Sequence, residues 1–211
     1  MRVLTLLLFS ALFPLGAHAQ WRQFTDLEEF FSVNLPGEPE IREIAYDSEY
    51  GATLPAKVYS VTDGGSLHSV TVVNFSDAQS AYAELADRSD EANNASLWLY
   101  DQRASISYAA RNFRLRGGDV TFDAWHHIDL VEGHQMQITN PDNSRTYASI
   151  YLHNSRLYIL EATVPEGSLP QGLFQASLSF LDETGTKIRY RLFPDGSRLQ
   201  LGETGPQEPA P

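Results

Sequence analysis

Residues 121–164 read TFDAWHHIDLVEGHQMQITNPDNSRTYASIYLHNSRLYILEATV, and this stretch decides the fold. It is rich in β-branched and aromatic residues, which favour strands. Three short interruptions divide it, and each is composed of residues typical of turns: Glu132-Gly133, 140–143 and Asn154-Ser155. Strand-forming runs that are separated by short turns pair with their neighbours along the chain. The stretch therefore predicts an antiparallel meander.

Further strands are predicted on the N-terminal side of this meander. Residues 56–61 and 67–75 are β-branched runs, and the Gly-containing cluster at 62–66 between them has the length of a hairpin turn. A strand is also predicted at about 30–35, where apolar and polar residues alternate until Pro36-Gly37 ends the pattern.

Helical patterns flank the meander on both sides. In the region 77–112, apolar residues recur with helical spacing after Asp77, which has the character of a helix cap. The weak helix formers at 93–94 favour two helices over one. A third helix is predicted from Ser168 to Phe180, with Pro170 tolerable in its first turn.

The domain organisation follows from these elements. We expect one α+β domain over residues 20–201, with the helical region at 77–112 as an insert and a final hairpin over 186–201. Residues 202–211 are polar and rich in proline, so we expect a disordered tail.

The first nineteen residues have the pattern of an export signal. Arg2 precedes an apolar run over residues 3–15, and Ala17-His18-Ala19 is typical of a signal-peptidase site. We therefore expect a mature chain that starts at Gln20 and is periplasmic or secreted. The apolar run is shorter than the roughly 20 residues of a spanning helix, and no later segment is longer or more apolar, so no membrane span is expected.

Composition restricts the partners and the chemistry. The chain has no cysteine, which excludes disulfides, a thiol nucleophile and a lipid-modified cysteine anchor. Its formal net charge is −12 at pH 7, and a nucleic acid is an unsuitable partner for an acidic chain without a basic stripe. No catalytic or cofactor-binding motif is present, so no cofactor is expected and a non-catalytic role is favoured over an enzyme.

Several short motifs suggest a family. An aromatic-led FSVNLPGEPE, the runs KVYSV and SVTVVNF, and IYLHNSRLYILEATVP followed by FQASLSF together resemble the PsbP-like family of uncharacterised exported bacterial proteins. The resemblance covers about residues 21–181. It implies an α/β/α sandwich, in which an antiparallel sheet carries helices on both faces, and a role as an accessory or binding protein.

A histidine cluster is the best candidate for a metal site. His126, His127 and His134 lie close in sequence, and three carboxylates accompany them: Asp123, Asp129 and Glu132. Imidazole and carboxylate groups are ligands for zinc and similar ions. In a strand, His127 and Asp129 share one face while His126 points to the other, and a turn at Glu132-Gly133 would place His134 opposite Val131 or Leu130. The alternative is that these are polar residues of a half-solvated sheet.

A second candidate site is the only concentration of basic residues in the acidic chain. It consists of Arg103, Arg111, Arg114 and Arg116. Arginine forms bidentate contacts with carboxylates, so the cluster is a candidate for an anionic ligand or partner. The alternative is that these side chains compensate the helix dipole and form local salt bridges.

Aromatic residues on neighbouring predicted strands offer a third possibility. Trp125, Tyr147, Tyr151 and Tyr158 either line a groove for a sugar or peptide or form cross-strand pairs in the core.

Three functions remain open from the sequence. The first is a binding or accessory protein of the cell envelope, which holds a protein or a small ligand. The second is a metal-dependent or other enzyme that uses His126, His127 and His134. The third is a structural envelope component without a ligand. Export and the absence of catalytic motifs favour the first.

Overall fold

The computed structural model describes residues 21–85 and 96–201. The predicted export signal at 1–19 and the predicted tail at 202–211 lie outside these ranges. Within the described part, no helix combines the length and the apolar character that crossing a membrane requires.

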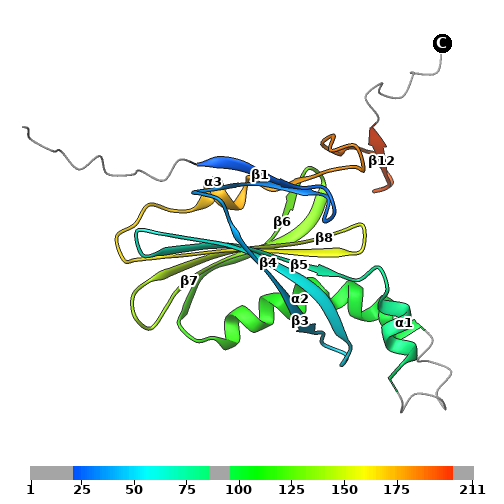
Figure 1. Cartoon of the computed structure of the whole chain (residues 1–211), viewed down its shortest axis with the longest axis horizontal. Helices are drawn as coiled ribbons and strands as arrows, with labels where there is room; N and C mark the ends of the chain where they lie inside the picture. Colours follow the sequence, from blue (N-terminus) through cyan, green and yellow to red (C-terminus); the bar gives the residue numbers. More distant parts are fainter. Residues whose placement is uncertain (1–20, 86–95, 202–211) are drawn as a thin grey trace, which may run out of the picture.

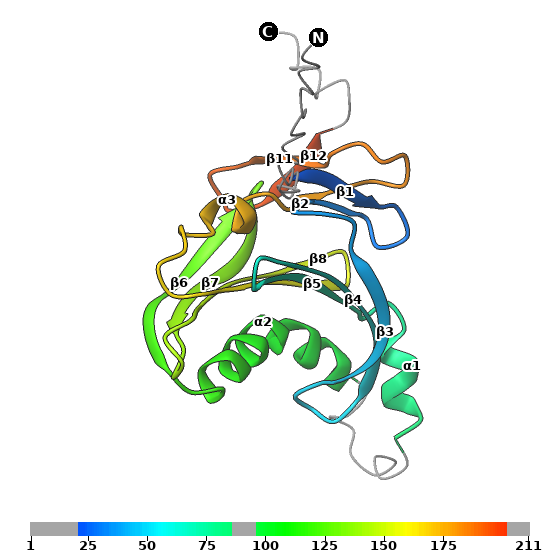
Figure 2. The ribbon, with the colours of Figure 1, turned by 60° about the vertical axis from the view of Figure 1, so that its left-hand side comes forward.

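A seven-stranded sheet forms the body of the molecule (Figures 1 and 2). Its spatial order is β3-β4-β5-β9-β8-β7-β6, and every neighbouring pair is antiparallel. The strands are β3 (Glu40–Asp47), β4 (Thr53–Asp63), β5 (Ser66–Asn74), β6 (Asp119–Ile128), β7 (Val131–Thr139), β8 (Arg145–His153) and β9 (Arg156–Val164). Strands β6 to β9 pair in chain order, which confirms the meander predicted for residues 121–164.

Helices and a small second sheet cover the two faces of this sheet. The helices are α1 (Ala78–Ala83), α2 (Leu97–Leu115) and α3 (Gly172–Gln175). A second sheet, in the order β1-β2-β10, contains β1 (Arg22–Asp26), β2 (Phe31–Leu35) and β10 (Ser179–Phe180). A separate hairpin near the C-terminus consists of β11 (Arg189–Leu192) and β12 (Arg198–Leu201), within the range 186–201 of the expected hairpin.

The predicted α/β/α sandwich is wrong, because helices do not cover both faces of the large sheet. Figure 2 shows α2 beneath one face, while β1 and β2 lie over the other. On that second face the only helix among the described residues is α3, which has four residues. The structure is therefore mostly antiparallel sheet, with a small sheet in the place of the second helical layer.

The cause of this difference lies in the segment for which one long helix is predicted, Ser168 to Phe180. Only Gly172–Gln175 is helical. Pro170 cannot donate a helical hydrogen bond, and Gly172 lowers helix propensity, so the helix does not extend toward the N-terminus. At the other end, Phe180 pairs with Phe31 of β2 and is completely buried.

One hydrophobic core lies between the large sheet and α2. Ile106, Ala109, Ala110 and Phe113 follow the i, i+3, i+4, i+7 spacing of one helix face, and all four are buried. They belong to the same cluster as Met136 and other buried residues of the sheet. This packing fixes the C-terminal half of α2 against the large sheet.

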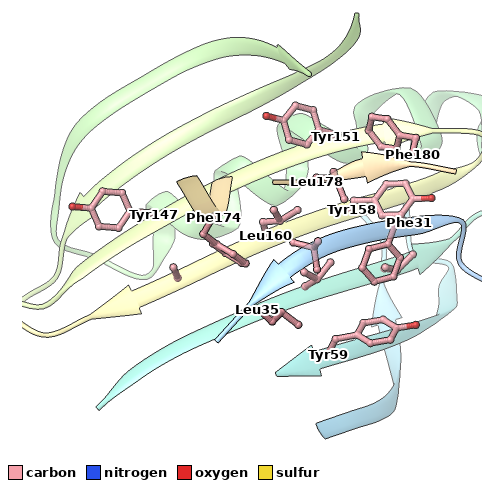
Figure 3. Packing of buried hydrophobic residues seen from close by; sticks show 14 of the residues in the cluster. Phe31, Leu35, Tyr59, Tyr147, Tyr151, Tyr158, Leu160, Phe174, Leu178 and Phe180 are labelled. Carbon is pink, nitrogen blue, oxygen red and sulfur yellow. The ribbon is translucent and has the colours of Figure 1, made fainter. Parts of the chain in front are cut away.

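The second core lies between the two sheets and is rich in aromatic rings (Figure 3). The ring of Phe31 lies 5.1 Å from that of Tyr59 and 5.9 Å from that of Tyr158, measured between centroids. Phe180 lies 5.4 Å from Tyr158 in the same way. Such tilted and edge-on pairs add about 0.5–1.5 kcal/mol each beyond the burial of their area.

Polar contacts hold the turn between β1 and β2 against the large sheet. The hydroxyl of Tyr59 donates to Asp26 Oδ2 at 2.7 Å, and that of Tyr158 donates to the carbonyl of Glu29 at 2.8 Å. Glu29 is largely buried and accepts from Arg156 Nε at 3.0 Å, with Lys57 Nζ 3.2 Å from its other oxygen. The two tyrosines of the core therefore also anchor the small sheet.

The turn between β6 and β7 differs from the sequence prediction. The turn residues are Asp129 and Leu130, with φ of 48° and 63°, and not Glu132-Gly133. Gly133 lies inside β7 opposite Tyr151 of β8. A Cβ at position 133 would stand 2.2 Å from the Tyr151 ring, so this glycine provides close approach and not turn geometry.

We predict that Gly133→Ala lowers the free energy of unfolding by about 1–3 kcal/mol, because the added methyl group forces Tyr151 from its position. Urea denaturation measures this change. Gly172→Ala is the matched control, since nothing lies within 4 Å of its added Cβ and its backbone is helical. Equal stability of the two variants would contradict the packing described for Gly133.

Candidate functional site

Three hollows on the surface are candidate sites. One, of about 480 Å³, includes Glu29 and Lys57, whose charges are paired with each other. A second, of about 290 Å³, lies beside α3 and includes Trp21. A third, of about 510 Å³, includes Trp125 and two of the predicted site histidines, and we call it the Trp125 groove.

The Trp125 groove lies at the closed end of the β6–β7 hairpin. Its lining residues come from β6, from the following turn, from β7 and from β11: Trp125, His126, His127, Leu130, Glu132 and Leu192. Trp125 is 68% exposed and Leu192 is 55% exposed. Trp125 and Leu192 provide two exposed apolar walls. Trp125, His127 and Glu132 lie on the face of the hairpin toward α2 and His126 lies on the other, so the groove extends over both faces at this end of the hairpin.

Contacts of the C-terminal segment place Leu192 in the groove. The Tyr190 hydroxyl and His153 Nε2 are hydrogen bonded at 2.6 Å. Lys187 Nζ lies 3.0 Å from Asp129 Oδ2, and Arg198 Nη1 donates to the carbonyl of Leu130 at 3.2 Å. These three contacts join the β11–β12 region to the β6–β7 turn and to β8.

His126 is oriented by the core. Its Nδ1 lies 3.0 Å from the hydroxyl of Tyr151, which is completely buried on the face toward the small sheet. Burial lowers the pKa of His126, and the neighbouring His127 lowers it further. Both effects favour the neutral form of the His126 ring, which stacks with the exposed His127 ring at a centroid distance of 5.9 Å.

His134 belongs to a different environment, on the face that packs against α2. Its Nε2 contacts Asp123 Oδ1, and Arg114 of α2 donates to the same carboxylate through Nε at 2.7 Å and Nη2 at 2.8 Å. The Arg114 hydrogen bonds, and then the contact with His134, hold the pKa of Asp123 below its usual value. The ring of Trp125 packs edge-on against His134 at 5.4 Å.

The three histidines of the predicted metal site therefore do not converge. His126 pairs with Tyr151 on one face, His134 pairs with Asp123 on the other, and His127 is exposed. The predicted position of His134 opposite Val131 or Leu130 is wrong, because its partner is Trp125. No group of three or more His, Asp or Glu side chains within residues 21–85 and 96–201 is arranged to hold a metal ion.

The four arginines likewise do not form one site. Arg111 binds Glu49 at 3.1 Å, Arg114 binds Asp123, and Arg116 binds Glu161 at 2.6 Å. Arg103 is exposed on α2 and has no ion pair with another described residue. Three separate carboxylates thus engage three of the predicted ligand-binding arginines, as local salt bridges do.

The aromatic residues divide into core and surface. Tyr147, Tyr151 and Tyr158 are at most 1% exposed, so these three are core residues. Trp125 alone of the four remains open to a ligand. Sequence reasoning missed Leu192 and Tyr190, because no local pattern indicates that the last hairpin packs against the β6–β7 turn.

The groove has the chemistry of a binding site. An exposed indole and two leucines provide apolar contact, and Glu132, His126 and His127 provide hydrogen-bonding groups around them. Because Nδ1 of His126 engages the Tyr151 hydroxyl, its Nε2 is the ring nitrogen left for a ligand.

Comparison with known proteins adds no family to this description. Neither a protein-family model nor a curated protein matches the chain. The resemblance to the PsbP-like family stays a prediction from the sequence.

We predict that the buried imidazole of His153 makes stability depend on pH. Burial, and then the charge of Arg198, lower the pKa of His153 from 6.5 to about 4. Because the unfolded chain binds this proton more readily, the free energy of unfolding falls as the pH drops from about 6.5 to about 4, by up to about 3 kcal/mol from this group.

Urea denaturation at several pH values measures this dependence. His153→Phe should show a smaller loss of stability on acidification than the unchanged protein. Tyr190→Phe is the control, since it removes the hydrogen bond but keeps the buried imidazole and its titration. If His153→Phe leaves the slope unchanged between pH 6.5 and 4, the assignment fails.

A zinc titration tests the metal hypothesis. We expect no binding heat by calorimetry at Zn²⁺ concentrations up to about 100 µM, because no three of the predicted ligands among the described residues are arranged around a common point. Binding that is lost in His134→Ala would show that the histidines rearrange around a metal.

Proposed function

We propose that this protein is an exported binding or accessory protein of the cell envelope and that the Trp125 groove holds its ligand. The observation that carries the proposal is the 68% exposure of Trp125 beside the polar side chains of His127 and Glu132. A tryptophan side chain is usually buried to a large extent, and a large exposed apolar side chain in a hollow is typical of an interaction site.

The export part of the proposal is supported by the signal pattern at 1–19. Without a disulfide, the groove depends on packing and on the contacts of Tyr190, Lys187 and Arg198 for its shape. These contacts place the Leu192 wall before any ligand arrives, which lowers the entropy lost on binding.

We predict that Trp125→Ala abolishes ligand capture. The purified protein is immobilised, exposed to an envelope extract, and crosslinked, and the recovered components are quantified by mass spectrometry. Components that bind in the groove should fall at least fivefold with Trp125→Ala, because the indole provides most of the apolar contact.

Trp21→Ala is the matched control. Trp21 is also exposed, at 47%, but it lines the separate hollow beside α3. Components that are retained by Trp21→Ala and lost with Trp125→Ala support the proposal. Recovery of the same components by both variants and by the unchanged protein would refute it.

A further inference from the structure

We propose that the free edge of β6 is a docking strand, and that an extended, positively charged segment of a partner protein pairs with it and places one side chain in the Trp125 groove. This inference rests on the proposed function and names the class of its ligand. Four features of the edge carry it.

The first feature is an unpaired row of backbone groups. β6 is the last strand of the large sheet and, among the described strands, pairs only with β7 (Figure 2). The two-residue turn with positive φ is closed by Ile128 and Val131, and such a closing pair exchanges both hydrogen bonds. Hydrogen-bonded and non-bonded pairs alternate along the strands, so the N–H and C=O groups of Asp123, Trp125 and His127 point outward.

The second feature is the lack of protection. Edge strands are usually short, or carry lysine, proline or other charged residues that prevent pairing with another chain. β6 has ten residues without lysine or proline. Of its two carboxylates, Asp123 is paired with Arg114, whereas Asp119 is the first residue of the strand. Asp119 and the register shift between Val120 and Phe122 both lie outside the segment from Asp123 to His127, which is therefore the unprotected part of the edge. The opposite edge strand differs, because four of its eight residues are charged: Glu40, Arg42, Glu43 and Asp47.

The third feature is exposed apolar surface along the same strand. Val120 is 42% exposed and Phe122 is 43% exposed, in addition to Trp125. From the pairing with β7, Val120 and Trp125 lie on the face toward α2, and Phe122 lies on the other face. An incoming strand with apolar or aromatic side chains would therefore find cross-strand partners on both faces.

The fourth feature is charge, which selects the occupant. The net charge of −12 opposes pairing of two copies through this edge and favours a basic partner. Glu132 in the groove has no ion pair with another described residue, whereas Arg198 on the opposite side is held by the Leu130 carbonyl and the Tyr190 ring. A lysine or arginine of the partner can lay its aliphatic part on Trp125 and direct its charge to Glu132.

Peptide selection and NMR test this inference. Random nonapeptides are displayed on phage and selected on the purified protein, and the most enriched peptide is synthesised. We expect it to be basic, with apolar residues at alternate positions. On binding, amide hydrogen exchange of Asp123, Trp125 and His127 should slow at least tenfold, because their N–H groups gain acceptors.

A second peptide separates strand pairing from side-chain contact. The same sequence with N-methyl groups at alternate residues, on the edge that faces β6, should bind at least tenfold more weakly. The isomer with methyl groups at the intervening residues is the control and should bind like the parent. Equal binding of the two methylated forms would overturn the inference, as would failure to enrich any peptide.

Two further outcomes identify a different occupant. If the protein alone is a dimer by light scattering and the three amides are already protected in it, a second copy occupies the edge and the inference fails. If capture from the envelope extract depends on Trp125 while no peptide protects β6, the proposed function stands and this inference fails. If capture does not depend on Trp125 and no peptide protects β6, the proposed function and this inference both fail.

Discussion

The contact between the ring of Tyr151 and the backbone of Gly133 is the constraint on which the geometry of the site depends. Any side chain at position 133 would collide with this ring, so only glycine allows β7 to lie opposite β8 in the observed register. A shift of one residue would exchange the two faces of the strand. With the register fixed, the β6–β7 pairs bring His126 to the face of Tyr151 and leave His134 beside Asp123 and Arg114 on the face of α2.

The two faces of the large sheet are covered by different means, and this asymmetry leaves one edge open. On one face, α2 buries a single helical stripe and uses Arg114 to reach Asp123 on β6. On the other, the small sheet is anchored chiefly over β4 and β9, through Tyr59 and Tyr158. No described strand extends beyond β6. The exposed indole of Trp125 therefore results from the arrangement of layers and not from a local irregularity.

Local sequence patterns predicted those parts of the fold that local interactions determine. The meander over 121–164, with its Asn154-Ser155 turn, has the predicted strand order. Strand patterns and turn residues are properties of short segments, so the sequence of each segment is enough to predict them. The C-terminal end of the helix predicted over 168–180 and the turn predicted at Glu132-Gly133 were wrong for one reason. Tertiary packing determines both. Phe180 pairs with Phe31 of β2, and Gly133 leaves room for the ring of Tyr151 on β8, and in each case the partner is distant in sequence. The three histidines of the candidate metal site do not converge, because His134 lies opposite Trp125 beside Asp123 while His126 faces Tyr151 on the other side of the sheet.

An exposed apolar edge strand carries a risk of aggregation, because its unpaired backbone groups pair with strands of other chains. Three residues of β6 nevertheless expose large apolar side chains, while β3 carries charges at half of its positions. The negative net charge reduces this risk, because copies of an acidic chain repel each other. The same charge attracts a basic segment, and Glu132 beside Trp125 continues that preference inside the groove. Charge thus provides selectivity at an edge whose backbone alone would pair with any extended chain.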